Sequence, residues 1–287
     1  MPGTLYLVAT PIGNLGDFSP RARTVMSEVD FIAAEDTRVT KKLMTALELP
    51  SKPLVSYFEH NRRQRGEEIL ARLLAGESCA LVTDAGTPAV SDPGEDLVAL
   101  CAPAGVPVIP VPGCCAAVCA LAASGLPTGR WCFEGFLSVN KKARREHLDA
   151  LAHETRTMIF YEAPHKLRQT LDDLAAAFGG ARRIALSREL TKLHEEIFKT
   201  TLGEAAARYA GEEPRGEFVL VLAGAPEGAG EAESPPTLAE AAAAARRLME
   251  GGLPPAAAAR QAAAGTPYSK GDVYRELIRA QAEDPKK

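Results

Sequence analysis

Residues 79–94 read Cys-Ala-Leu-Val-Thr-Asp-Ala-Gly-Thr-Pro-Ala-Val-Ser-Asp-Pro-Gly, and this stretch decides the fold class. It begins with an apolar run that predicts a buried strand, and the residues that follow it, 95–104, predict a helix. A strand, a loop of small residues and a helix, in that order, form the ligand crevice of an open α/β sheet. Gly86 lets a ligand approach the backbone, and Pro88 restricts the shape of the loop. A tight connection without a ligand is the alternative interpretation.

Two further stretches repeat this design. Residues 6–8 predict a first strand, and Thr-Pro-Ile-Gly-Asn-Leu-Gly-Asp at 10–17 is the loop after it. Residues 106–111 predict another strand, followed by Pro-Gly-Cys-Cys at 112–115 and a helix of small residues over 116–124. Because the carboxyl ends of parallel strands meet at one edge of a sheet, we expect the three loops to line a single crevice.

Alternating strand and helix signals predict an α/β protein with two α/β domains and a small helical module at the C-terminal end. Residues 131–136 are expected to form the last strand of the first domain, and a basic, polar segment at 138–145 is expected to separate it from the second. The helical module fits either a helix-turn-helix-like unit or a cap that packs or mediates dimerisation. The predicted limits are 1–137 and 138–226 for the two domains, 223–236 for a flexible linker, and 237–287 for the module.

Composition and charge describe an ordinary globular protein. Of the 287 residues, 46% are hydrophobic and 24% are charged, and no apolar run is long enough to span a membrane. The six cysteines form no Cys-x-x-Cys pair and the histidines are scattered, so no metal site is expected. The first residues lack the features of a secretory signal, so we expect a cytoplasmic protein with reduced thiols. The net charge of −4 argues against a protein that coats nucleic acid, although basic clusters at 62–65 and 141–145 are candidate RNA contacts or solvated helix faces.

Polar residues that follow a buried strand are the candidates for chemistry. Glu35, Asp36 and Arg38 come directly after an expected strand at 31–34, where the crevice opens. The alternative is that Asp36 caps the next helix and pairs with Arg38. Asp84 has a similar position and is expected to bind a ligand or to brace its own loop.

Other familiar signals are weak or missing. His60 and Asn61 follow two aromatic residues and are candidates to contact a base or a sugar, or they form a plain loop. The sequence contains neither the phosphate loop of NTPases, nor the dinucleotide fingerprint after the first strand, nor a nucleophile elbow.

Seven motifs occur in this order along the chain: residues 10–17, Ala-Glu-Asp-Thr-Arg at 34–38, residues 84–94, Pro-Gly-Cys-Cys-Ala at 112–116, Phe-Glu-Gly-Phe-Leu at 133–137, Phe-Tyr-Glu-Ala-Pro-His at 160–165 and Arg-Glu-Leu-Thr-Lys at 188–192. Through them it resembles the bacterial small-subunit ribosomal RNA 2′-O-ribose methyltransferases of the tetrapyrrole methylase superfamily. The resemblance implies two α/β domains with S-adenosylmethionine (SAM) in the cleft between them, in a homodimer. It also implies methyl transfer to the ribose 2′-oxygen of a cytidine in the decoding region of 16S rRNA, in the 30S subunit.

The resemblance also implies roles for individual residues. The three loops would contact SAM, and Tyr161 and Leu190 would close over its adenosine from the second domain. Cys114 stands where we expect a proline, a departure that should loosen its loop slightly. The residues expected to bind the cofactor are Pro11, Ile12, Asp84, Gly86, Thr87, Pro88, Val90, Gly113, Cys115, Ala116, Tyr161 and Leu190.

The expected chemistry is mainly the positioning of two reactants. SAM carries the reactive sulfonium, so the protein binds and aligns it, and a base or a cation near the weakly acidic ribose hydroxyl would help. Glu35, Asp36 and Arg38 are expected to form the polar wall around that hydroxyl. Methylation of a tetrapyrrole carbon by the same fold is the main alternative, and a non-catalytic nucleic-acid-binding protein is another. The residues expected to bind substrate are Asn14, His60, Asn61, Arg188, Glu189 and Lys192.

Overall fold

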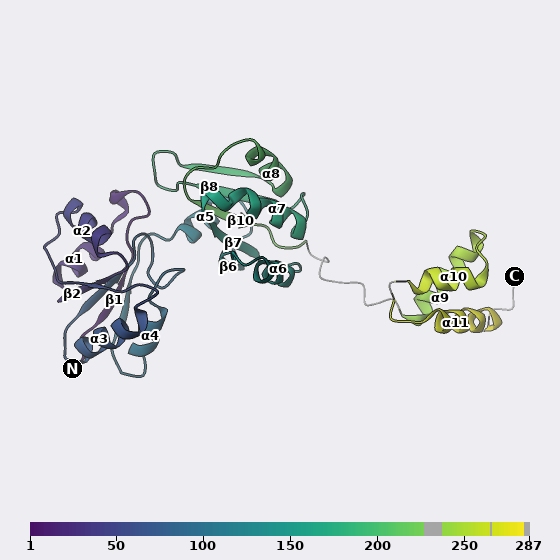
Figure 1. Ribbon diagram of the computed structural model, residues 1–287, viewed down its shortest axis with the longest axis horizontal. Coiled ribbons are helices and arrows are strands. Elements are labelled where there is room, and N and C mark those ends of the chain that lie inside the picture. The colour runs from purple at the N-terminus through teal and green to yellow at the C-terminus, as the bar shows by residue number, and fades with distance from the viewer. Residues whose placement is uncertain (227–236, 265, 284–287) are drawn as a thin grey trace. The chain divides into compact units, whose positions relative to one another are not determined.

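The computed structural model describes residues 1–226, 237–264 and 266–283, with side chains up to residue 280. The chain forms two compact units, Met1–Ala225 and Pro226–Lys287, and the first of them contains two five-stranded sheets (Figure 1). The predicted α/β class with two sheets and helices at the C-terminal end is therefore confirmed. Most of the predicted linker, residues 227–236, lies outside the described residues.

The first sheet is parallel and is buried on both faces. Its strand order is β3-β2-β4-β1-β5, with every neighbouring pair parallel. On β4, Cys79 and Leu81 share a core with α3 and α4, whereas Ala80 and Val82 share a core with α1 and α2. Burial on both faces explains why this strand is a continuous apolar run. The elements are β1 (Leu5–Val8), α1 (Pro20–Glu28), β2 (Phe31–Ala34), α2 (Thr37–Ala46), β3 (Leu54–Ser56), α3 (Arg62–Leu74), β4 (Cys79–Val82), α4 (Glu95–Cys101) and β5 (Val108–Val111), with a 3₁₀ turn η1 at Leu15–Asp17.

The second sheet is mixed, and helices also cover both of its faces. Its order is β6-β7-β10-β8-β9, with β6 and β7 parallel and the other pairs antiparallel. Helices α6, α7 and α8 cover one face, and α5 packs through Ala117, Ala120 and Leu121 on the other. Helix α5 follows a strand of the first sheet but belongs to the core of the second. The elements are α5 (Ala116–Ser124), β6 (Trp131–Phe136), α6 (Lys141–Ala150), β7 (Thr157–Glu162), η2 (Pro164–Lys166), α7 (Leu167–Phe178), β8 (Arg183–Arg188), β9 (Glu196–Thr201), α8 (Leu202–Ala210) and β10 (Phe218–Leu222).

Two sequence-based expectations about the join between the sheets are wrong. Residues 131–136 do form a strand, but β6 pairs with β7 of the second sheet and is not the last strand of the first. The basic stretch 138–145 is not a separator either, because Asn140 caps α6, and Arg144 and Leu148 of that helix are buried. Both errors have one cause: the pairing partner of a strand and the buried side of a helix depend on residues that are distant in sequence.

The second unit is a three-helix module with a core of small residues. Thr237 and Glu240 form a capping box at the start of α9, as a threonine before an apolar helix predicts. Alanines from α9 and α10 fill the centre with Val273 and Leu277 of α11. Such small side chains bury little apolar area each, so this core is thin. The helices are α9 (Leu238–Glu250), α10 (Pro255–Ala263) and α11 (Lys270–Glu283), and no helix in the described ranges has the length and apolar character that a membrane span requires.

Candidate functional site

The loops that follow β1, β4 and β5 are joined to one another by hydrogen bonds. The N–H of Thr10 donates to the carbonyl of Gly86 at 2.8 Å, and the N–H of Gly86 donates back to the carbonyl of Thr10 at 3.1 Å. The hydroxyl of Thr87 donates to the carbonyl of Cys114 at 2.9 Å. The prediction that three strand-end loops meet is therefore confirmed.

The loop after β4 has an unusual backbone. Ala89 and Ser91 have φ values of 66° and 65°, in the left-handed region that residues with a Cβ seldom adopt. Gly94, with a φ of 149°, has no room for a side chain, because a Cβ there would lie 2.9 Å from the Leu81 side chain. Backbone strain of this kind often accompanies a functional loop, because the surrounding structure must impose it.

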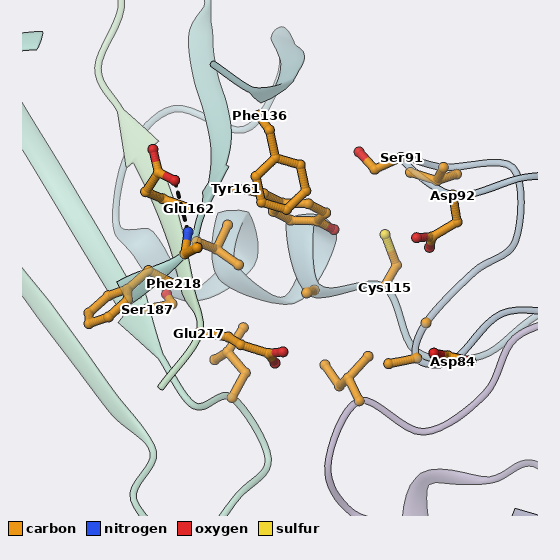
Figure 2. Close-up of a pocket in the computed structure, with 18 of the residues that line it drawn as sticks. Asp84, Ser91, Asp92, Cys115, Phe136, Tyr161, Glu162, Ser187, Glu217 and Phe218 are labelled. Atoms are coloured by element: carbon orange, nitrogen blue, oxygen red, sulfur yellow. Dashed lines mark hydrogen bonds between the residues drawn. The ribbon is translucent and has the colours of Figure 1, made fainter. Parts of the chain in front are cut away.

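A cavity of about 420 Å³ opens beside the joined loops, and both sheets contribute to its walls. Figure 2 shows Asp84, Asp92 and Cys115 on one side of the open space and Phe136, Tyr161, Ser187 and Glu217 across it. This volume lies in the usual range for pockets that bind small ligands. The lining residues are Ile12, Glu35, 84–87, 90–92, Cys115, Ala116, Phe136, 161–164, Ser187, Leu190, Lys192 and 217–219.

Most of the residues expected to bind a cofactor lie in this wall. Three of the expected residues, Pro11, Pro88 and Gly113, belong to the same loops without lining the cavity. Gly113 instead allows close packing, because a Cβ there would lie 2.8 Å from the Cβ of Ala9. The expected residues that line the cavity are Ile12, Asp84, Gly86, Thr87, Val90, Cys115, Ala116, Tyr161 and Leu190.

Two carboxylates at neighbouring strand ends are held in place by backbone N–H groups. The Glu35 carboxylate accepts a hydrogen bond from the N–H of Asp84 at 3.3 Å, and the Asp84 carboxylate accepts one from the N–H of Asp36 at 3.2 Å. Burial raises the pKa of Glu35 and of Asp84, and nearby carboxylates raise both further. Among the described residues, no group of His, Cys, Asp and Glu side chains is arranged to hold a metal ion.

Asp36 and Arg38 lie beside the cavity rather than in its wall. Asp36 caps α2 by accepting a hydrogen bond from the N–H of Arg38 at 2.8 Å, and it pairs with the Arg38 guanidinium at 2.6 Å. These hydrogen bonds from Arg38 lower the pKa of Asp36 to about 2. Of the three residues expected around the substrate hydroxyl, only Glu35 lines the cavity. Asp36 and Arg38 instead form the helix-capping pair that was the alternative interpretation for them.

An aromatic group forms the opposite wall. The Tyr161 ring packs edge-on against Phe133 and Phe136, with ring centroids 5.0 and 5.6 Å apart. The Tyr161 hydroxyl accepts a hydrogen bond from the N–H of Ala117 at 3.1 Å, which joins β7 to the first turn of α5. Burial raises the pKa of Tyr161 to about 12, so its hydroxyl stays protonated near neutral pH. Phe136 is 56% exposed and turns its ring toward the cavity (Figure 2).

Lys192 reaches from the second sheet to the loop after β1. Its Nζ donates to Glu189 and to Glu217, each at 2.9 Å. A Cβ on Gly13, whose φ is 151°, would lie 2.3 Å from Cγ of Lys192. The Lys192 side chain therefore lies across this glycine. The hydrogen bond that Lys192 donates to Glu189 is the main cause of the lowered pKa of Glu189.

The other residues expected to bind substrate lie outside the cavity wall. Asn14 and Asn61 accept hydrogen bonds from backbone N–H groups of their own turns, and Arg188 pairs with Glu196 at 3.6 Å. His60 is exposed, in the turn before α3. Of the six expected residues, Lys192 alone is part of the wall.

Sequence reasoning missed several lining residues. Asp92, Phe136 and Glu162 lie inside motifs that were quoted, so the signal was present, but no role was assigned to them. Ser187 lies on β8 and Glu217 directly precedes β10, and no motif marked either of them. Within the described part of the chain the buried Ser187 hydroxyl has no hydrogen-bond partner, which makes it a candidate ligand contact that only the structure reveals.

Comparison with known proteins identifies the family. The family model of the Tetrapyrrole (Corrin/Porphyrin) Methylases matches residues 4–206. The chain belongs to the tetrapyrrole methylase family. Ribosomal RNA small subunit methyltransferase I of Synechocystis is 53% identical to it, over 78% of this chain and 80% of that protein. The protein of the same name from Escherichia coli O157:H7 is 47% identical, over 77% of this chain and 78% of that protein. The resemblance that the ordered motifs indicated is thereby confirmed.

A solved structure has the same fold as this tetrapyrrole methylase. Uroporphyrin-III C-methyltransferase from Thermus thermophilus, complexed with S-adenosylhomocysteine, superposes with a TM-score of 0.53. The match covers 77% of this chain and 97% of that chain, with 20% sequence identity. At 20% sequence identity this match shows a shared fold and says nothing about substrate or residue roles.

Proposed function

We propose that this chain is a SAM-dependent methyltransferase of small-subunit ribosomal RNA, and that it methylates the ribose 2′-oxygen of a cytidine in the decoding region of 16S rRNA. The observation that carries the proposal is the cavity where three strand-end loops of a tetrapyrrole methylase face an aromatic wall. The relatives are named as methyltransferases of small-subunit ribosomal RNA, which supports this substrate class. The choice of atom and nucleotide comes from the resemblance of the motifs.

The residues around the cavity fit SAM. Glu35 and Asp84 place negative charge on one side of the cavity, which suits a ligand that carries a sulfonium and an ammonium group. The unpartnered hydroxyl of Ser187 offers a hydrogen bond, and the exposed ring of Phe136 offers a flat apolar surface to a base. When bound, SAM supplies an electrophilic methyl group, so the role of the protein is to hold the acceptor oxygen in line with it.

The chain's own contacts make such positioning possible. Tyr161 is fixed to α5, and Lys192 is fixed by two carboxylates while it lies over Gly13. Groups held in this way lose little further freedom when a ligand binds, so more of the binding energy can serve alignment. In this proposal Glu35 belongs to the wall near the acceptor hydroxyl, whereas Asp36 and Arg38 hold the start of α2 next to it.

The proposed setting is a cytoplasmic homodimer that acts on the 30S subunit. Exposed basic residues of α3 and α6, such as Arg63 and Lys141, are the proposed contacts with phosphates, since the net charge of −4 confines positive potential to patches. Several neighbours in these patches pair with acidic residues, as Arg65 does with Glu68 at 2.5 Å.

The test is methyl transfer to defined acceptors. The purified protein with isotopically labelled SAM is offered 30S subunits, naked 16S rRNA and a porphyrinogen, and nuclease digests are analysed by mass spectrometry. The expected product is labelled 2′-O-methylcytidine from one position of 16S rRNA. Label in the porphyrinogen and not in RNA would support the tetrapyrrole alternative, and failure to bind SAM in calorimetry would support a non-catalytic protein.

A further inference from the structure

Asp92 differs from the other carboxylates of the cavity wall. Glu35 and Asp84 accept hydrogen bonds from backbone N–H groups, Glu162 accepts from Thr170 and from the N–H of Ala163, and Glu217 accepts from Lys192. The Asp92 carboxylate has no hydrogen bond or ion pair to any residue that the structure describes, although its side chain is half-buried. A half-buried carboxylate without a partner is costly, so it requires an explanation.

The backbone around Asp92 fixes the direction of this side chain. Ser91 on one side has a φ of 65°, and Gly94 on the other has a φ of 149° with no space for a side chain. Pro93 between them restricts the chain further. Figure 2 shows the carboxylate directed into the open space, on the side of Cys115 and across from Tyr161.

We propose that Asp92 is the proton acceptor of the methyl-transfer reaction, an inference that rests on the proposed function. As the ribose 2′-oxygen bonds to the methyl carbon, the Asp92 carboxylate takes the proton of that hydroxyl. The methyl–sulfur bond breaks at the same time, and its electron pair stays on sulfur. Asp92 then loses the proton to water after the products leave.

The groups around Asp92 suit this role. Burial, together with the charges of Glu35 and Asp84, raises the pKa of Asp92 to about 7, where a carboxylate accepts protons far better than at its ordinary value. Tyr161, with a pKa of about 12, is protonated at that pH and does not compete. Cys115 is the other titratable group nearby, and Lys192, the cation of the wall, is held by Glu189 and Glu217.

The test compares Asp92→Asn with Glu95→Gln, which changes an exposed carboxylate three residues on. Single-turnover transfer of labelled methyl to 16S rRNA is measured between pH 5.5 and 9, and SAM affinity is measured by calorimetry. For the wild type and Glu95→Gln we expect a rate that rises tenfold per pH unit up to about 7 and then levels off. For Asp92→Asn we expect a rate lower by on the order of 10² to 10⁴, without that rise, and a SAM affinity within about twofold of wild type. Asp92→Glu should recover part of the rate.

Each result bears on a different claim. An Asp92→Asn variant that keeps the wild-type rate, or whose SAM affinity falls in proportion to its rate, would overturn the assignment of Asp92 and leave the proposed function standing. A wild-type protein that binds SAM but methylates no RNA would overturn the proposed function, and the assignment with it. If Asp92→Asn does not fold, the pH–rate profiles of the wild type and Asp92→Glu are compared instead. A midpoint near pH 7 in the wild type that moves in Asp92→Glu would support the assignment of Asp92, and a midpoint that does not move would overturn it.

Discussion

At the scale of single residues, this tetrapyrrole methylase contains side chains whose placement costs stability. Asp92 is a partly buried carboxylate with no hydrogen-bond or ion-pair partner among the described residues, next to Glu35 and Asp84. Its pKa is about 7 in the folded chain, against an ordinary value of 3.8. Between these values the folded protein binds more protons than the unfolded chain, so stability falls as the pH rises through this window.

Asp92→Asn should therefore be more stable than the wild type above pH 7. We expect a gain of about 1 to 2 kcal/mol in the free energy of unfolding, less than the full shift would give because solvent screens the charge. The difference in the free energy of unfolding between Asp92→Asn and the wild type should shrink as the pH falls and vanish near pH 4. Urea unfolding from pH 4 to 8 measures it without any ligand, and a gap that is independent of pH would contradict the raised pKa.

Gly13 offers a second prediction at this scale. An alanine there should displace Lys192, because its Cβ would overlap the lysine chain. We expect SAM affinity and methyl transfer to fall at least tenfold. Gly105→Ala is the matched control, because Gly105 also has a positive φ, of 66°, but has nothing within 4 Å of an added Cβ. The control should cost about 1 kcal/mol of stability and leave binding unchanged. Equal effects on binding in the two variants would show that Lys192 does not depend on Gly13.

At the scale of elements, a buried polar contact attaches α6 to α7. Arg144 donates to Asp173 at 2.6 Å and to the hydroxyl of Thr170 at 2.8 Å, and Thr170 in turn donates to Glu162 in the cavity wall. The neighbouring Arg145 is exposed and only approaches Asp149, at 3.7 Å. Two adjacent arginines of one helix thus have different structural roles.

Arg144→Met should lower the free energy of unfolding by about 2 to 3 kcal/mol, because it leaves the buried Thr170 hydroxyl and the half-buried Asp173 carboxylate without this donor. Arg145→Met should leave the unfolding curve unchanged. Chemical denaturation of the two variants provides the comparison, and a similar loss in both would mean that the Arg144 contacts add nothing beyond a surface charge.

The same helix shows how far the sequence could be interpreted. The apolar run of β4 and the small-residue loop after it identified a strand, a crevice and its lining, because strand ends in a parallel sheet follow from chain direction alone. The basic residues of α6 looked uniform, since nothing in their order tells which of them meets Asp173. The position of β6 and the isolation of Asp92 were likewise unpredictable, because each depends on partners that only the folded chain brings near.

At the scale of the whole molecule, everything that lines the cavity belongs to the first compact unit. The cores of both sheets also lie within Met1–Ala225. The three-helix module has a separate core of alanines with Val273 and Leu277. The cavity and the module therefore belong to different units.

A chain that stops after Ala225 should fold and bind SAM within about twofold of the full-length affinity. Calorimetry on both chains measures this. If the truncated chain loses most of its affinity for SAM, the module supports the cavity. If its affinity for SAM is unchanged but its activity on 30S subunits is lost, the module contributes to RNA binding.

The polypeptide passes from the first sheet to the second once within the first unit, at residues 112–115, just before α5. These residues also touch the cavity through Cys115 and accept the hydrogen bond of Thr87 at Cys114. Because residues 112–115 are the one covalent connection between the two sheets in the first unit, a change in the spacing of the sheets would require a change in the backbone angles of these residues. A ligand bound in the cavity would contact this same segment through Cys115. Substitutions within residues 112–115 should therefore change the rate of donor binding and the rate of product release together.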